Sequence, residues 1–150
     1  MQGHRARPRG GGRRPNAACI ARRYDGETWS IQQNVGHFAD LEALFASWLD
    51  EGATTLRPAD MTDQKTNEAN HNARETSEVL AGFRLLPEQF VTRAESLDTA
   101  YLARLAMHPR AHVPMRVVDT MPFHAEHDDH HLARIREVIR RNAQQTALRR

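Results

Sequence analysis

The chain has 150 residues, about the length of one domain with a single core, and its abundant Ala, Leu, Arg and Glu favour a helical class. Its formal charge of +2 is uneven, because residues 1–24 hold seven arginines and no acid, leaving 14 basic against 19 acidic groups in the remaining 126 residues. A single cysteine, Cys19, excludes an internal disulfide, and no apolar run approaches the roughly 20 residues of a membrane span. Together these features predict a cytoplasmic protein.

We expect residues 1–24 to form a disordered basic tail that precedes a helical domain over residues 25–150. Residues 1–18 are rich in Gly, Arg and Pro and lack apolar periodicity. Their arginines could neutralise nucleic-acid phosphates. However, the same 18 residues contain no aromatic side chain to stack on bases, and the rest of the chain is acidic. Nucleic-acid binding is therefore disfavoured, and no residue pattern around Cys19 indicates a catalytic site.

The first predicted helix begins at Ser30. Ser30 and Gln33 have the spacing of a capping box, in which each side chain bonds to a free backbone N–H at the helix start. Apolar residues then recur at steps of three and four, which is the pattern of one buried helical face. Gly52 is the predicted stop. The apolar positions are Ile31, Val35, Phe38, Leu41, Leu44, Phe45, Trp48 and Leu49.

The polar segment 53–73 is predicted to be a long loop with room for a short helical turn. Loops of this length in compact domains often line functional sites. Four residues of this loop are candidates for polar contacts in such a site: Asp63, Thr66, Asn67 and Asn70.

Two long helices and one short one are expected after this loop. The second long helix covers residues 76–97, with a kink at Pro87 because proline removes one backbone hydrogen bond. A short helix is predicted from Asp98 to Met107. The last helix is predicted to start at Pro114 and to run to about Asn142, with a bend at Pro122.

The segment 124–131 (HAEHDDHH) places four imidazoles within eight residues of the last predicted helix. His127 and His131 are four residues apart, so they lie one above the other on one face. Two histidines spaced in this way can hold one metal ion from a rigid element. Ile135 continues nearly the same stripe, which indicates that this face points inward. His130 falls on another face and is expected to meet solvent.

His37 lies in the middle of the first predicted helix, beside its apolar stripe. A lone histidine is more often structural, and the pair His127 and His131 by itself is compatible with a solvated face. Burying all three without partners would cost about 1–3 kcal/mol each, which a shared metal ion would remove. Three histidines with an open position are typical of a catalytic metal site. We further expect His124 to be a fourth ligand or a supporting residue, and Asp40 to orient His37. Three histidines in predicted loops are expected only to border a pocket: His71, His108 and His112.

Two motifs resemble the DinB-like (damage-inducible) family of metal-binding proteins. Residues 28–42 (TWSIQQNVGHFADLE) are similar to its W-S…H-x-x-D-x-E motif, and residues 123–135 (FHAEHDDHHLARI) to its H-D-x-H-H-L-x-x-I helix. The resemblance covers about residues 26–142 and implies an all-α, up-down-down-up four-helix bundle. It also implies a bound divalent transition ion, often zinc or nickel. The metal ligands that it implies are His37, His127 and His131.

The chain departs from this family before the Trp-Ser motif. The family has a long amphipathic helix there, whereas this sequence has its Arg- and Gly-rich segment. The first helix is therefore expected to be absent or replaced by the disordered tail, which would leave an apolar groove open. Either a second copy covers the groove in a homodimer, or the sequence is truncated or misassigned at its N-terminus. The change of composition near Tyr24 favours the second explanation.

The leading functional hypothesis is a metal-dependent enzyme of the thiol S-transferase or hydrolase type. A divalent ion would lower the pKa of a water molecule or a thiol and so generate a nucleophile. The resemblance implies a small-molecule substrate such as a low-molecular-weight thiol. No general base is assigned, because Glu126 points about 100° away from His127 around the helix. The alternative is a non-catalytic metal-binding module of a stress response, in which the histidines only fix the bundle.

Overall fold

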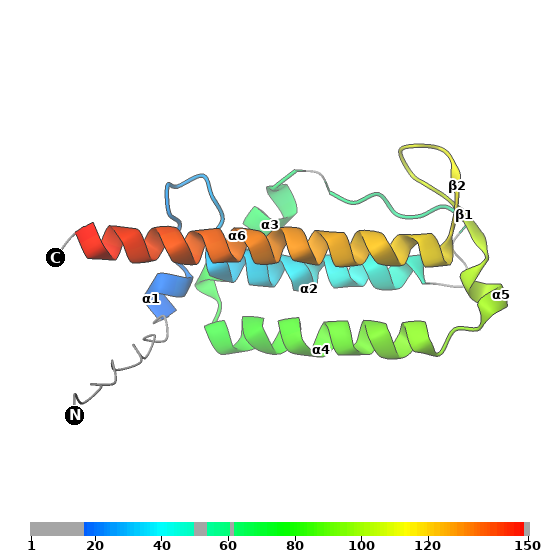
Figure 1. Cartoon of the computed structure of the whole chain (residues 1–150), viewed down its shortest axis with the longest axis horizontal. Helices are drawn as coiled ribbons and strands as arrows, with labels where there is room; N and C mark the ends of the chain where they lie inside the picture. The colour runs from blue at the N-terminus through cyan, green and yellow to red at the C-terminus, as the bar shows by residue number, and fades with distance from the viewer. Residues whose placement is uncertain (1–16, 50–53, 61, 149–150) are drawn as a thin grey trace, which may run out of the picture.

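Three long helices form the body of the protein in the computed structural model, which describes residues 17–49, 54–60 and 62–148. They are α2 (Ile31–Trp48), α4 (Thr76–Glu95) and α6 (Met121–Leu148). Helix α2 packs against both of the others. In Figure 1, α2 and α4 run in the same direction and α6 runs in the opposite one. The last three helices of an up-down-down-up bundle have these relative directions, so the predicted helical fold is confirmed.

Helix α2 begins with the predicted capping box. The Ser30 hydroxyl accepts a hydrogen bond from the Gln33 backbone N–H at 3.0 Å, and the Gln33 side-chain oxygen accepts one from the Ser30 N–H at 3.1 Å. This exchange fixes the start of the helix because it satisfies two N–H groups that have no partner within the helix. The helix ends at Trp48, with Leu49 as its cap. The predicted stop, Gly52, lies outside the described residues.

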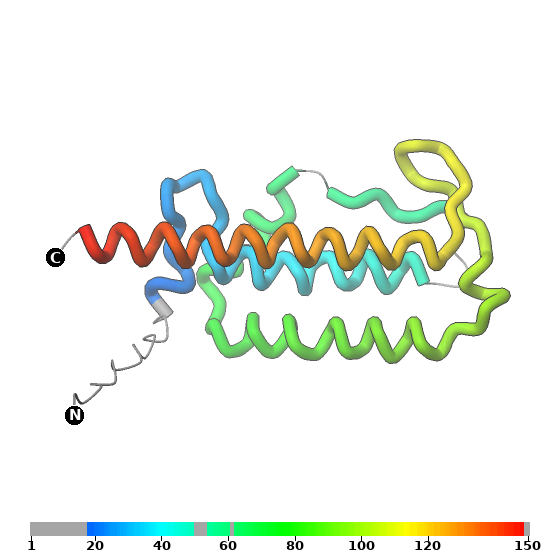
Figure 2. The backbone as a smooth tube through the Cα atoms, in the orientation of Figure 1, coloured from blue at the N-terminus to red at the C-terminus, as the bar shows by residue number. Residues whose placement is uncertain are grey.

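The connection between α2 and α4 crosses the length of the bundle, which is why these two helices are parallel. Figure 2 shows it returning along the helices toward the start of α2. It contains two short helical segments, α3 (Gln64–Glu68) and η1 (His71–Ala73), in agreement with a long loop that includes a helical turn. The Gln32 side chain anchors it by donating to the carbonyl oxygens of His71 at 2.7 Å and Arg74 at 2.8 Å.

The region between α4 and α6 differs from the prediction. The short helix α5 covers only Thr99–Leu102, and it is followed by strand β1 (Leu105–Met107), which pairs with the antiparallel strand β2 (Pro114–Arg116). The backbone of Met107 also bonds to Thr54 and Leu56 on its other side. Partners on both sides favour an extended backbone over a helix, and they come from segments distant in sequence.

The start of the last helix was therefore predicted too early. A 3-10 turn, η2 (Val117–Thr120), precedes α6, so Pro122 lies in the first turn of α6. A proline there removes an N–H that has no partner within the helix, and no bend is required. Helix α6 also continues past the predicted end at Asn142, to Leu148. Helix α4 runs without a break through Pro87.

The apolar core closes the end of the bundle where α2 ends. Phe45, Trp48, Leu56 and Ala106 form its buried centre. Elsewhere α4 and α6 expose large apolar side chains; these are Leu85, Val91, Leu132 and Ile139. Pairing with a second copy across these positions stays a prediction.

The N-terminal segment is ordered from an earlier residue than the predicted boundary at residue 24. Residues 17–20 form the short helix α1 (Ala17–Ile20). Arg23 then donates hydrogen bonds to the side-chain oxygens of Gln33 at 2.9 Å and Asn67 at 2.7 Å. The rest of the predicted tail, residues 1–16, lies outside the described residues. It holds five of the seven arginines on which the nucleic-acid hypothesis depends. No helix in the described part of the chain combines the length and the apolar character needed to cross a membrane.

Candidate metal centre

Three histidines from two antiparallel helices converge between α2 and α6. His37 comes from the middle of α2, and His127 and His131 come from successive turns of α6. One ring nitrogen from each lies within 4.8 Å of the other two, and the His37 and His127 Nε2 atoms are 3.2 Å apart. Two ligand nitrogens of a tetrahedral zinc ion, each about 2.05 Å from the metal, would be about 3.3 Å apart. The spacing of this pair therefore fits a shared divalent ion.

Each of the three rings has an oxygen atom near its other nitrogen. His37 Nδ1 is 2.8 Å from the Thr66 hydroxyl, His131 Nδ1 is 3.0 Å from Asn34 Oδ1, and His127 Nδ1 is 3.4 Å from Asp128 Oδ1. Such oxygen partners orient metal-binding imidazoles and leave the opposite nitrogen free for the ion. The donor set and its supports thus fit a metal held by three Nε2 atoms. The residues that provide these supports are Thr66, Asn34 and Asp128.

The tautomer of His131 follows from the hydrogen bonds of Asn34. The Asn34 amide nitrogen donates to the Ser30 carbonyl oxygen at 2.8 Å, so the amide oxygen faces His131. An oxygen acceptor requires the proton on His131 Nδ1, which leaves a lone pair on Nε2. Asn34 is only 1% exposed, so this amide orientation is held inside the bundle.

Burial keeps the imidazoles of His37 and His131 neutral at physiological pH. Desolvation, with a smaller contribution from His127, lowers the pKa of His37 to about 4. Desolvation, followed by the potentials of His37 and His127, lowers the pKa of His131 to about 3. Trp29 contributes to this shielding, since its ring stacks on His131 at 5.7 Å and lies 4.8 Å from His37. Neutral imidazole is the form that binds a metal ion, so no proton must leave these two residues first.

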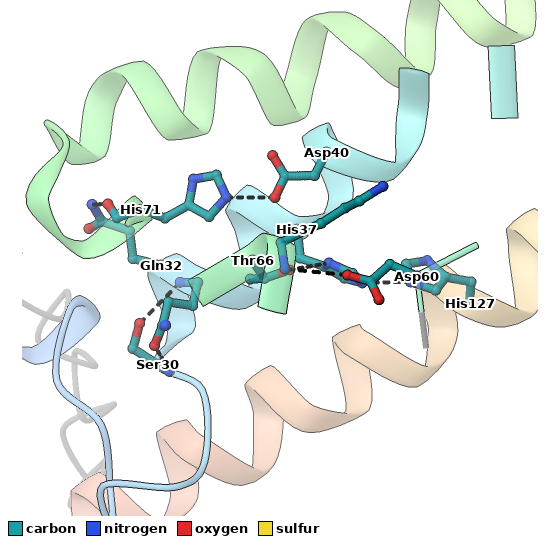
Figure 3. Close-up of polar contacts among 10 residues, drawn as sticks. Ser30, Gln32, His37, Asp40, Asp60, Thr66, His71 and His127 are labelled. Carbon is teal, nitrogen blue, oxygen red and sulfur yellow. Dashed lines mark hydrogen bonds and ion pairs between the residues drawn. The ribbon is translucent and has the colours of Figure 1, made fainter. Parts of the chain in front are cut away.

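Two neighbouring residues do not play the predicted roles. Asp40 does not orient His37; it accepts a hydrogen bond from His71 Nε2 at 2.8 Å instead. Figure 3 shows the reason: Asp40 and His71 lie on the side of α2 toward α4, whereas His37 and Thr66 lie on the other side. His71 is also 1% exposed, so it is a core residue and not the border of a pocket.

His124 lies apart from the three converging rings. Its Nε2 atom is 3.3 Å from a carboxylate oxygen of Glu42, and both side chains are buried. Its ring stacks on Phe45 at 4.1 Å and meets the edge of Phe90 at 4.4 Å. The expectation of a fourth histidine ligand is therefore wrong. The alternative of a supporting role stays a prediction, since His124 Nε2 is also 3.7 Å from Oδ2 of Asp128, the carboxylate beside His127. His124 is three residues before His127, which turns it toward α4 and the Glu42 side of α2.

Of the remaining described histidines, His130 and His112 are exposed and His108 is half-buried. His130 is exposed, as predicted, although it lines the rim of the adjoining cavity. His108 is turned to its own loop, where its Nδ1 atom accepts from the backbone N–H groups of Arg110 and Ala111. His112 is exposed in that loop with a positive φ of 52°. Neither loop histidine lines this cavity.

A cavity of about 540 Å³ opens beside the three histidines. This volume lies in the range of about 300–1,000 Å³ that is usual for small-molecule sites. Leu41, Phe45 and Phe123 form an apolar part of its wall, and charged side chains lie at other places on its lining. Glu126 is exposed and does not line the cavity, in agreement with its rejection as a general base.

Of the three residues that support the imidazoles, only Thr66 was among the candidates predicted from the sequence. Thr66 was one of four polar loop candidates, and the structure selects it because α3 places its hydroxyl against His37. Asn34 lines the same cavity as His37, but its partner is on α6. Asp128 directly follows His127 in the chain, a position from which a side chain usually points elsewhere.

Substitution of Asn34 tests whether this residue supports metal binding. We expect Asn34→Ala to weaken zinc affinity by about 10- to 100-fold, because His131 loses the acceptor that fixes its tautomer. Asn34→Asp keeps an oxygen acceptor and should bind zinc more tightly than Asn34→Ala. Competition with a chromophoric chelator measures the affinity, and the ¹⁵N chemical shifts of the His131 ring report the tautomer. Equal zinc affinity in the wild type and Asn34→Ala would contradict this role.

The family model for the DinB superfamily matches residues 6–135. The solved structure of YfiT from Bacillus subtilis aligns with a TM-score of 0.67, at 23% sequence identity, over 85% of this chain and 74% of that chain. YfiT is described as a probable metal-dependent hydrolase with an unusual four-helix bundle topology. At this identity the likeness shows the shared fold alone. Among curated proteins, no sequence match was found.

Proposed function

The chain belongs to the DinB superfamily, and from this premise we propose that it is a metal-dependent enzyme whose divalent ion is held by His37, His127 and His131. The observation that carries the proposal is the convergence of three ring nitrogens within 4.8 Å beside an open cavity. A divalent ion in this position would supply Lewis acidity that lowers the pKa of a water molecule or a thiol. Zinc and nickel both suit a set of imidazole ligands.

The residues of the chain would hold the ion and shape its surroundings. Asn34 fixes the proton of His131 on Nδ1, and Thr66 and Asp128 stand at the outer nitrogens of the other two rings. Trp29 covers the rings of His37 and His131 and limits the access of water to them. The cavity leaves one side of the centre open to a small molecule. An open side is what separates a catalytic metal site from a structural one.

Hydrolysis and thiol transfer are the two reactions that such a centre would support. The description of YfiT as a probable metal-dependent hydrolase favours hydrolysis. Thiol transfer remains the second candidate, since a thiol of low molecular weight would occupy the same open position as water. The alternative outside the enzymes is a non-catalytic metal-binding module.

Reconstitution separates these possibilities. The full chain would be stripped with a chelator, reloaded with zinc or nickel, and analysed for metal content. The stripped and the reloaded protein would then be assayed against a panel of ester and amide substrates. Consumption of small thiols in the presence of electrophiles would be measured for both as well. We expect one metal ion per chain and turnover only in the reloaded protein. Stoichiometric metal without turnover would favour the non-catalytic module, and failure to retain either metal would refute the site.

A further inference from the structure

We propose that the cavity selects small molecules that carry a hydrocarbon arm on one side of the reacting group and a polar end on the other. The inference rests on the proposed function, because it places the reacting group at the three histidines. It goes further by naming the chemical class of the substrate and its direction along the bundle. The observations that carry it are the order of side chains along the cavity and an exposed aromatic ring at one end.

The antiparallel arrangement of α2 and α6 gives the cavity a fixed direction. At one end Asn34 of α2 contacts His131 of α6 at 3.0 Å, and farther along His37 meets His127 at 3.2 Å. At the other end the rings of Phe45 and Phe123 are 6.2 Å apart between centroids. All of these residues line the same cavity. The metal centre therefore lies between two ends of different composition.

The end that α2 and α6 form beyond His127 is apolar, while the crossing loop also contributes Asp60, Thr62 and Asp63 to the cavity lining. Leu41, Phe45 and Phe123 line this end, and Phe123 stands one helical turn before His127. The Phe123 ring is 42% exposed, although it contacts both Phe45 and Trp48. An isolated exposed apolar side chain needs no explanation, but one that continues a buried aromatic wall into an open cavity offers apolar surface to a ligand.

The opposite end carries charge. Glu27 and Arg134 line the cavity there, together with Thr28 and the amide of Asn34. A hydrocarbon group placed on these residues would remove water from charged and polar atoms without replacing their hydrogen bonds, which costs free energy. The two ends thus discriminate between the two orientations of a molecule whose arms differ in polarity.

Linear alkyl hydroxamates test this inference directly. The hydroxamate head binds zinc, so its alkyl chain would extend from the metal centre of the zinc-loaded full chain. The series from acetohydroxamate to octanohydroxamate lengthens this chain one methylene at a time. Calorimetric titration gives the affinity of each. A buried methylene is worth about 0.8 kcal/mol, so we expect affinity to rise by up to about fourfold per added methylene until the apolar end is filled.

Two matched substitutions on α6 locate the arm. Phe123→Ser should flatten the gain per methylene, whereas Leu132→Ser should keep it, because Leu132 is similarly exposed at 38% but does not line the cavity. A flat series in zinc-loaded wild type would overturn the inference and leave the metal centre intact, and so would an equally steep series in Phe123→Ser. If elemental analysis finds no zinc in the reloaded protein, the proposed function fails and this inference fails with it.

Discussion

Replacing any one of His37, His127 and His131 by alanine is expected to weaken zinc binding by at least about a hundredfold. Four-ligand zinc sites bind with about 10–16 kcal/mol, so each ligand accounts for roughly 3 kcal/mol, and every 1.4 kcal/mol is a factor of ten. The ring nitrogens of the three residues lie within 4.8 Å of one another, so each loss should affect the same ion. Elemental analysis after gel filtration, followed by competition titration, gives stoichiometry and affinity.

His130→Ala is the matched control for these variants. His130 directly precedes His131 on the same helix, but it is exposed and does not belong to the converging group. We expect this variant to retain one zinc ion per chain with the affinity of the wild type. If His130→Ala loses zinc as the other variants do, the metal is held by the histidine-rich segment 124–131 in general and not by the proposed centre. If one of the three ligand variants keeps full affinity, that residue is not a ligand.

The second large effect concerns Gly36, where alanine is expected to lower the free energy of unfolding by about 2 kcal/mol. An added Cβ would lie 2.3–2.5 Å from three atoms of the His71 ring. The ring cannot retreat easily, because it is 1% exposed and its Nε2 atom is bonded to Asp40 at 2.8 Å. Overpacking of a core costs about 1–3 kcal/mol and sometimes more. The gain of up to about 1 kcal/mol that alanine brings to a helix interior is smaller.

Gly82→Ala supplies the control with the opposite sign. Gly82 also lies inside a long helix, α4, and the nearest atom to an added Cβ is the Cβ of Ala39 at an ordinary 3.8 Å. Alanine should therefore stabilise the protein there by up to about 1 kcal/mol. Urea unfolding of both metal-free variants measures the two effects. Stabilisation by Gly36→Ala would mean that the His71 ring does not pack on α2 as the structure has it.

The His71 contact also explains why a glycine directly precedes His37. The chain needs its long crossing loop to lie close to α2, and Gly36 allows the His71 ring to approach the helix backbone. The same loop delivers Thr66 to His37 at 2.8 Å. Packing on one side of α2 and orientation of the candidate ligand on the other side thus depend on one segment.

Parts of this architecture could be predicted from local sequence patterns. The capping box of Ser30 and Gln33, the apolar stripe of α2 and the four-residue spacing of His127 and His131 each depend on residues within one or two turns of a helix. Such patterns are set by backbone geometry, so they do not need the rest of the fold. For the same reason the exposure of His130 could be predicted from its angle around α6.

Other features depended on contacts between distant segments. The start of the last helix was predicted too early because the pairing of β2 with β1, and of Met107 with residues 54–56, decides the local backbone. The partner predicted for Asp40 was wrong for a similar reason: Asp40 lies on the side of α2 toward α4, where the crossing loop places His71 against its carboxylate. His124 likewise pairs with Glu42 on α2, far away in the sequence.

By itself, the sequence determined a helical bundle, the start of α2 and the three histidines as candidate ligands, because helical periodicity and capping act over a few residues. Only the tertiary structure decided which oxygen supports each imidazole and that His71 is buried. It also decided that the apolar and the charged lining residues that α2 and α6 contribute to the cavity lie at opposite ends of this helix pair. Except for Asp128, which adjoins His127, the supporting oxygens come from residues 29 to 97 positions away in the chain. A short-range pattern in the sequence does not encode such contacts; they follow from packing, burial and the requirement that buried polar atoms find partners.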